Sequence, residues 1–214
     1  DALGARLALI DAAESSIDAQ YFLMKHDMAG TVFVGKLLEA ADRGVRVRLL
    51  LDDVFTTVDD DSFLLLNQHP NIEMRLFNPV GRGRASFWLN YLADFDRANR
   101  RMHNKSFTVD NQVTILGGRN IGKSYFGLSE KYNFHDLDVL GIGPVARDAS
   151  ELFDNFWNSS WSVPASDLPF EVEAGEYDKR RAQLSDKVQS SPLLEHFPRV
   201  PADWSQRLAA LPGQ

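Results

Sequence analysis

Residues 101–110 read Arg-Met-His-Asn-Lys-Ser-Phe-Thr-Val-Asp, and residues 117–120 read Gly-Gly-Arg-Asn. This pattern predicts a β-hairpin in which one strand carries His103 and Lys105 and a β-branched strand returns beside it. Alternate residues of a strand point to one face, so the imidazole and the ammonium should project together. Asp110 and Asn111 tolerate the left-handed conformation that a two-residue hairpin turn requires. We therefore predict a catalytic hairpin over residues 103–118.

The side chains of this hairpin suit a phosphodiester. His103 can act as a nucleophile or carry a proton near neutral pH, and Lys105 offers a compact positive charge to a phosphate oxygen. Gly117 and Gly118 allow the backbone to approach a ligand closely, and Asn120 adds a neutral amide donor. Each residue alone has an ordinary structural explanation. The complete string favours a site that stabilises charge on a phosphate.

The string H-x-K-x-x-x-x-D followed by Gly-Gly-x-Asn resembles the phospholipase D superfamily, and its context is most similar to the N-terminal half of the bacterial C-type cardiolipin synthases. Segments 17–22, 44–53, 138–144 and 153–157 fit the same resemblance, which covers roughly residues 1–163. It implies an α/β/α sandwich with a mixed, largely parallel sheet, forming one half of a pseudo-twofold pair.

The resemblance also implies roles for individual residues. The catalytic set carried over is His103, Lys105, Asp110, Asn120 and Asp136, and the substrate-binding set is Gly117, Gly118, Arg101 and Tyr21. Asp136 is the predicted carboxylate that orients the imidazole, with Asp138 as the alternative, while Asp110 is expected to shape the hairpin. His135 is expected to be a surface or supporting group. No metal and no cofactor is implied.

Two departures from the family pattern affect the prediction. Gly118 stands where many members have serine, and the chain holds a single H-x-K string, because His26, His69, His135 and His196 lack a lysine two residues later. The active site of the family needs two such motifs. We therefore expect the N-terminal half of a longer enzyme, completed by a second half-domain in cis or by a homodimer partner.

Composition limits the alternatives. The 214 residues are 44% hydrophobic, carry a net charge of −7 and include no cysteine, which suits one packed domain plus an appendage without disulfides or thiolate metal sites. The acidic balance argues against non-specific nucleic-acid binding. A basic group lies around the motif and suits an anionic headgroup, although a solvated surface is the alternative; it comprises Arg82, Arg84, Arg97, Arg100, Arg101 and Lys105.

Periodicity predicts alternating helices and strands in residues 1–163 and a connector over 164–214. Helices are expected at 3–14, 29–43, 61–67, 145–158, 175–188 and 202–210, and strands at 17–23, 45–51, 72–77 and 136–142, besides the hairpin. The aromatic segment 87–95 is either a lipid entry or, as the favoured interpretation, a helix packed on its own sheet. No apolar run is long enough to span a membrane.

These observations lead to a functional hypothesis. We expect transphosphatidylation through a phosphatidyl-histidine, with phosphatidylglycerol as substrate, phosphatidylethanolamine as a second candidate and cardiolipin as product. The enzyme should work peripherally at the bacterial inner membrane surface. The alternatives are a homodimeric phosphodiesterase or nuclease of the same superfamily, and an inactive half-domain.

Overall fold

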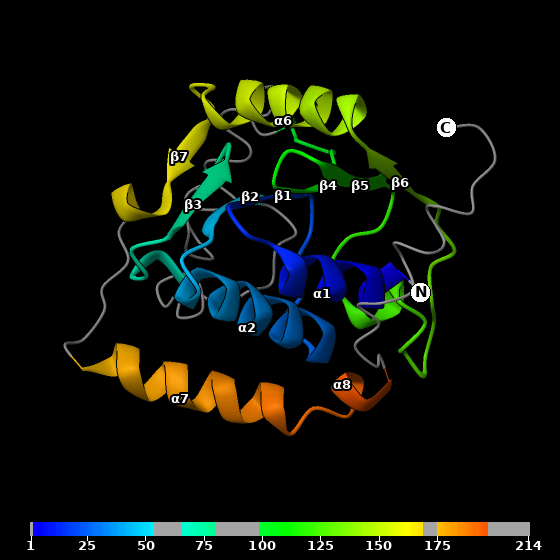
Figure 1. Ribbon diagram of the computed structural model, residues 1–214, viewed down its shortest axis with the longest axis vertical. Helices are drawn as coiled ribbons and strands as arrows, with labels where there is room; N and C mark the ends of the chain where they lie inside the picture. Colours follow the sequence, from blue (N-terminus) through cyan, green and yellow to red (C-terminus); the bar gives the residue numbers. More distant parts are fainter. Residues whose placement is uncertain (1, 54–65, 80–98, 169–174, 197–214) are drawn as a thin grey trace.

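The fold is a mixed β-sheet covered by helices on both faces (Figure 1). The computed structural model describes residues 2–53, 66–79, 99–168 and 175–196. In this part of the chain a seven-stranded sheet has the order β6-β5-β4-β1-β2-β3-β7. Its strands are β1 (Ser16–Tyr21), β2 (Arg46–Asp52), β3 (Ile72–Phe77), β4 (Ser106–Val109), β5 (Val113–Gly117), β6 (Asp138–Ile142) and β7 (Ser162–Pro164).

The α/β architecture and the mixed sheet are confirmed, but the parallel part is smaller than the sequence predicted. Only β1–β2 and β2–β3 are parallel among the described strands, and the other four pairings are antiparallel. Ser106 pairs with Gln20, and Val109 pairs with Ile17. This register places the start of β4 beside the C-terminal end of β1.

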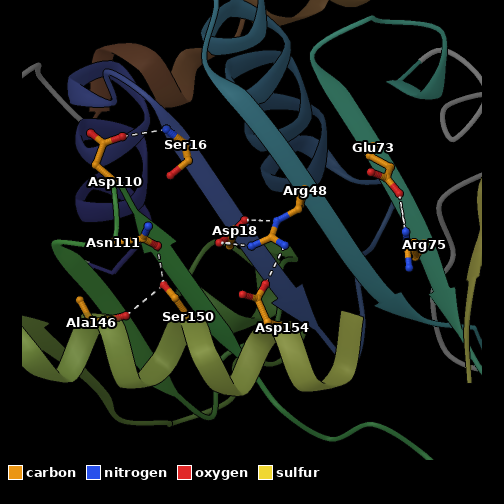
Figure 2. Close-up of polar contacts among 10 residues, drawn as sticks. All are labelled: Ser16, Asp18, Arg48, Glu73, Arg75, Asp110, Asn111, Ala146, Ser150 and Asp154. Carbon is orange, nitrogen blue, oxygen red and sulfur yellow. Dashed lines mark hydrogen bonds and ion pairs between the residues drawn. The ribbon is translucent and has the colours of Figure 1, made fainter. Parts of the chain in front are cut away.

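The helices α1 (Ala2–Ala12) and α2 (Met28–Asp42) cover one face of the sheet, and α6 (Pro144–Trp157) covers the other (Figure 1). Leucine, valine and phenylalanine side chains of α1 and α2 join those of the strands in one large buried core. On the opposite face, buried Asp18 accepts hydrogen bonds from Arg48, which also binds Asp154 of α6 at 2.7 Å (Figure 2). Apolar packing thus dominates one face, while the α6 face includes a paired polar layer.

The predicted connector begins within the packed domain. The boundary at 163–164 falls in β7, which pairs with β3, and α7 (Glu176–Gln189) lies along α2 on the side away from the sheet (Figure 1). Val188 is buried against Gly35, and Arg181 forms an ion pair with Asp42 at 2.6 Å. The described part of 164–214 therefore belongs structurally to the domain, including α8 (Pro192–His196).

Most periodic elements match their predictions to within two residues. The helix predicted at 29–43 is α2, those at 145–158 and 175–188 are α6 and α7, and the strand at 72–77 is β3. The helix predicted at 202–210, most of the helix at 61–67 and the segment 87–95 lie outside the described residues. No helix in the described ranges has the length and apolar character needed to cross a bilayer.

Candidate functional site

His103 and Lys105 meet at the ring of Phe22. The His103 and Phe22 ring centroids are 4.8 Å apart, and Lys105 Nζ lies 5.1 Å from the Phe22 centroid. Both residues precede β4, which begins at Ser106 rather than at the predicted residue 103. Their convergence is therefore set by the loop that precedes β4, in which Lys105 Nζ donates a hydrogen bond of 2.6 Å to the His103 carbonyl.

The two groups differ in exposure. His103 is exposed to solvent, whereas Lys105 is buried with only 7% of its surface accessible. Burial lowers the pKa of Lys105 because it penalises the charged ammonium, and the nearby Asp136 carboxylate partly offsets this effect. The site thus combines an accessible imidazole with a partly desolvated cation. That combination can attack a phosphorus atom and hold its oxygens.

The chain entering this loop is fixed by Asp52 at the end of β2. Asp52 is fully buried, and its carboxylate accepts hydrogen bonds from Arg101 Nη1 at 3.1 Å and from the Met102 backbone N–H at 2.9 Å. Arg101 Nη2 also donates to the Asn78 carbonyl at 2.8 Å. The Arg101 guanidinium therefore anchors the backbone next to His103, and its role in substrate binding stays a prediction.

The prediction that Tyr21 binds substrate is corrected, because Tyr21 lies in the core. Its side chain is completely buried, its hydroxyl accepts a 2.9 Å hydrogen bond from Arg6 Nε, and its ring meets Phe33 edge-on at 5.9 Å. Successive residues of a strand point to opposite faces, so Tyr21 faces α2 and the next residue, Phe22, faces away from it. Phe22, rather than Tyr21, therefore reaches the site.

The segment after β5 is joined to the end of β1. Ile121 forms a parallel bridge with Met24, and the Lys25 N–H donates to the Ile121 carbonyl at 2.9 Å. Asn120 is buried, and its Oδ1 accepts a 2.9 Å hydrogen bond from the Leu23 N–H. The carbonyl side of the amide is thereby used for structure, which leaves the Nδ2 group as its hydrogen-bond donor.

Gly117 and Gly118 are required by the acidic residues of the neighbouring segment. A Cβ at Gly118 would collide with the Asp136 carboxylate, and one at Gly117 would collide with Asp138 and the Leu137 carbonyl. A serine at residue 118 would therefore require the exposed Asp136 side chain to move. The predicted Asp136 lies near Lys105 and is exposed.

Asp138, the alternative to Asp136, is committed to other partners. Its Oδ2 pairs with Arg6 Nη1 at 3.0 Å and with Arg119 Nη1 at 3.5 Å. Its side chain is only 10% exposed. Asp136 therefore remains the better candidate for orienting His103, whereas Asp138 fixes the strand that carries Asp136.

Asp110 lies at the far end of β4 and shapes the hairpin and its surroundings. Its carboxylate accepts hydrogen bonds from the backbone N–H groups of Glu14, Ser15 and Ser16 and from the Ser15 hydroxyl, at 2.8–3.0 Å (Figure 2 shows the Ser16 contact). Asp110 and Asn111 have φ angles of 53° and 55°, the left-handed conformation predicted for the turn. Val109 pairs with Val113, so the loop also includes Gln112.

The remaining sequence predictions concern the basic residues around the motif, His135 and metal binding. Arg82, Arg84 and Arg97 lie outside the described residues, and Arg100 packs its guanidinium 5.8 Å from the Trp161 ring centroid. His135 is exposed. Within the described ranges, no group of three or more acidic, histidine or cysteine side chains is arranged to hold a metal ion.

Sequence reasoning missed the residues that support the site. Phe22 contacts both functional groups, Asp52 holds Met102, and Gln20 bonds the hydroxyl of Ser106 at 3.2 Å and the sulfur of Met102 at 2.9 Å. Alternation along β1 offered the available signal, because Gln20 and Phe22 share a face opposite to Tyr21. Asp52 ends β2, and its carboxylate anchors the chain just before His103.

Residues 7–157 match the family described as "Cardiolipin synthase, PLD-like domain". The chain is 45% identical over 208 residues to cardiolipin synthase C of Escherichia coli K12, covering 92% of this chain and 44% of that protein. It is 31% identical over 151 residues to a cardiolipin synthase of Geobacillus kaustophilus, covering 70% and 28%. The chain thus spans less than half the length of these curated relatives.

Solved structures share the fold at low sequence identity. NucT from Helicobacter pylori superposes with a TM-score of 0.54 at 17% identity, covering 76% of this chain and 90% of that one. Phosphatidylserine synthase from Haemophilus influenzae gives a TM-score of 0.56 at 15% identity, covering 87% and 40%.

Proposed function

Because the chain belongs to the cardiolipin synthase family of phospholipase D-like domains, we propose that it forms one half of a phosphatidyltransferase. The reaction passes through a phosphatidyl-histidine intermediate, and the second imidazole comes from a second half-domain. The substrate is phosphatidylglycerol, with phosphatidylethanolamine as a second candidate donor, and the product is cardiolipin. The enzyme acts peripherally at a bacterial inner membrane surface.

The convergence of His103 and Lys105 on Phe22 is the observation that carries this proposal. The accessible imidazole lies beside a buried ammonium, each about 5 Å from the same ring centroid. Asn120 is held at the end of β1 through its Oδ1, so its Nδ2 group is available to a non-bridging oxygen. A phosphate placed here meets a nucleophile and two donors. Such donors stabilise the charge that develops in phosphoryl transfer.

The reaction has two chemical steps, formation of the phosphatidyl-histidine and its transfer to the acceptor. His103 attacks the phosphorus atom of the donor lipid, a P–N bond forms, and the P–O bond to the leaving alcohol breaks as the second imidazole donates a proton. The hydroxyl of phosphatidylglycerol then attacks phosphorus, its proton returns to the second imidazole, and the P–N bond breaks. A covalent intermediate replaces one difficult displacement by two easier ones. In the alternative assignment the two imidazoles exchange roles.

Asp136 and Lys105 support this chemistry in different ways. Asp136 holds the useful tautomer of His103, as a carboxylate does in other histidine-centred sites. Lys105 binds a non-bridging oxygen through its charge. Its burial keeps that charge poorly solvated, which strengthens its attraction for a phosphate.

The single H-x-K string and the length of the chain relative to its homologue support the need for a second half-domain. The chain holds one H-x-K string, and it covers 44% of the Escherichia coli relative. One imidazole cannot serve as nucleophile and as proton donor to the leaving group in the same step. A homodimer could supply the second imidazole instead, and this would favour the phosphodiesterase or nuclease alternative.

A lipid-transfer assay tests the proposal. The full-length protein containing this chain is mixed with phosphatidylglycerol vesicles, and lipid products are identified by mass spectrometry. We expect cardiolipin from the full-length protein and no turnover from the isolated chain as a monomer. A chain that dimerises and hydrolyses a chromogenic phosphodiester without forming cardiolipin would instead establish the phosphodiesterase alternative.

A further inference from the structure

Aliphatic side chains are exposed along one edge of the domain, where β6 and α6 meet. Leu137, Val139, Val145 and Leu152 expose 75, 60, 41 and 51% of their surface, respectively. Single exposed apolar residues are common on soluble domains, whereas a contiguous group of them marks an interaction site. We call these four residues the edge patch.

The strand part of the edge patch lies on the α6 side of the sheet. Because strand residues alternate, Val139 and Gly141 of β6 point to the same face. A Cβ at Gly141 would lie 2.6 Å from Val145 Cγ1, so this is the face that α6 covers. Asp138 points to the opposite face, where it pairs with Arg6 of α1.

The helical part of the edge patch lies on the flank of α6 next to β6. Leu152 follows Val145 by about two turns, so the two side chains share one side of the helix. The inward side of α6 is formed instead by buried residues that include Ala146, Ala149 and Phe153. The flank that carries Val145 and Leu152 therefore continues the exposed surface of β6 outward from the core.

The backbone of β6 adds to this surface. β6 is the end strand of the sheet in the described chain, so no further strand pairs with its outer side there (Figure 1). Soluble proteins usually cover such an edge or place charged residues on it. The one charged residue of β6 is Asp138, and its carboxylate pairs with Arg6 and Arg119. The edge is therefore apolar and suited to contact with another protein domain.

The edge patch is continuous with the candidate site. Leu137 follows Asp136, which lies near Lys105, and the Leu137 carbonyl accepts a 3.2 Å hydrogen bond from the Gly118 N–H. Phe22 points away from α2, which is also the α6 side of the sheet. A domain that covers Leu137 therefore also borders the site.

We propose that the edge patch is the docking surface for the second half-domain and holds it where its imidazole can reach the phosphate at His103. This inference rests on the proposed function, which requires that imidazole. The chain covers 44% of the Escherichia coli relative, so a full-length protein of that size has the length for a second domain. A bilayer fits the edge patch less well, because the patch is aliphatic and lacks the tyrosine, tryptophan and lysine of membrane-interface surfaces.

Protection of thiols in the full-length protein tests whether the surface is covered. The chain has no cysteine, so Val139→Cys and Leu152→Cys each add one thiol, on a background in which any cysteine elsewhere is replaced by serine. We expect both to react with a maleimide on the order of 10²-fold more slowly than Gln183→Cys, an exposed position of α7. In urea the three rates should become equal. Equal rates in the native protein would overturn the proposal.

Photocrosslinking identifies what covers the surface. Benzoylphenylalanine in place of Leu152 in the full-length protein should crosslink to a peptide of the second half-domain of the same molecule, as read by mass spectrometry. Adducts confined to lipid, to a second copy or to residues 1–214, or no adduct at all, would overturn the proposal.

Activity separates this proposal from the function on which it rests. Val139→Lys should lower cardiolipin synthesis roughly tenfold or more, because a charge in the interface loses its hydration, whereas Gln183→Lys should leave it unchanged. If the crosslink forms but no variant or parent makes cardiolipin, the docking surface stands and the transferase function fails. If cardiolipin forms while the thiols stay reactive, the function stands and the docking surface fails.

Discussion

The H-x-K-x-x-x-x-D motif places its histidine and lysine at one end of β4 and its aspartate at the other, and the two ends differ in role. His103 and Lys105 precede the strand and gather at Phe22, whereas Asp110 follows it at the hairpin turn. At about 3.3 Å per residue, the five residues from Lys105 to Asp110 separate them by roughly 16 Å. The aspartate of H-x-K-x-x-x-x-D therefore takes no direct part at the imidazole end.

The charged groups at the two ends of β4 also differ in how completely they are hydrogen-bonded. The Asp110 carboxylate accepts four hydrogen bonds from three consecutive residues, Glu14, Ser15 and Ser16. The buried Lys105 ammonium, by contrast, donates a hydrogen bond to the His103 carbonyl and is paired less completely in the described chain. A fully paired charge stabilises a fold, while an incompletely paired one is costly to bury and can bind a ligand. This comparison predicts that substitutions of His103 or Lys105 reduce activity, whereas substitution of Asp110 reduces stability.

The largest effect is expected from His103→Asn in the full-length protein. Removing the nucleophile or proton carrier should lower turnover by on the order of 10³-fold or more. Because His103 is exposed, the melting temperature should change little. Transfer of labelled phosphatidyl groups and thermal unfolding measure the two quantities.

The matched control is His135→Asn, an exposed histidine beside Asp136. It should keep turnover within a few-fold of the parent, in keeping with a surface or supporting group. If His103→Asn retained full turnover, or if His135→Asn caused the larger loss, the assignment of the nucleophilic end of the motif would be wrong.

A smaller but more diagnostic effect is expected from Lys105→Met. Turnover should fall by about 10²-fold, because a donor to the phosphate is lost. Stability should rise by up to about 1 kcal/mol, since a poorly paired buried charge is removed. In Lys36→Met, by contrast, stability should fall by about 1 kcal/mol, because the buried Lys36 ammonium pairs with Asp11 at 3.2 Å and with Glu39 at 2.7 Å.

The sign of the pH dependence follows from the lowered pKa of Lys105, which burial causes. Between that pKa and the ordinary lysine value of about 10.4, the unfolded chain binds more protons than the folded one, so parent stability rises with pH. The advantage of Lys105→Met should therefore shrink as pH rises through this window. Denaturant unfolding at a series of pH values measures it. A stability loss in Lys105→Met at neutral pH would show that the ammonium is a structural group.

Periodicity was sufficient for most of the fold. The apolar spacing of 29–43 and the alternation of apolar and polar residues over 72–76 each describe an element whose packing follows from its own residues, and the structure contains both as α2 and β3. The motif likewise identified His103 and Lys105. The tertiary partners of these residues could not be predicted. The position of Arg101, for example, is set by Asp52, 49 residues away in the sequence.

Short or irregular elements also could not be predicted from the sequence. β7 has three residues and ends in proline, so it gives no periodic signal, and its pairing with β3 depends on α6 returning the chain to the sheet edge. The loop at 103–105 read as strand because its residues alternate. Pairing with β1 stops at Gln20, however, so β4 cannot extend to His103. The site thus arises where the regular pattern ends.

The smallest effect, and the one that completes the comparison, is expected from Asp110→Asn. The amide retains an acceptor oxygen but loses the charge that favours three backbone N–H donors, so stability should fall by about 1–2 kcal/mol at neutral pH after allowance for partial exposure. Burial alone would raise the pKa of Asp110, but the hydrogen bonds from Glu14, Ser16 and Ser15 lower it below its ordinary value. The stabilisation is therefore fully present above about pH 4 and disappears as pH falls through the lowered pKa.

Asp148→Asn is the matched control, because Asp148 is exposed on α6. Its unfolding free energy should stay within about 0.5 kcal/mol of the parent at every pH. Denaturant titrations of both variants and the parent at pH 7 and pH 3 give their free energies of unfolding. At pH 7 the value for Asp110→Asn should be lower than that of the parent, and this difference should be smaller at pH 3. A difference that persists unchanged in acid would mean that the turn depends on the shape of residue 110 rather than its charge. In that case the aspartate of the motif would be a packing residue, and the contrast between the two ends of β4 would no longer be electrostatic.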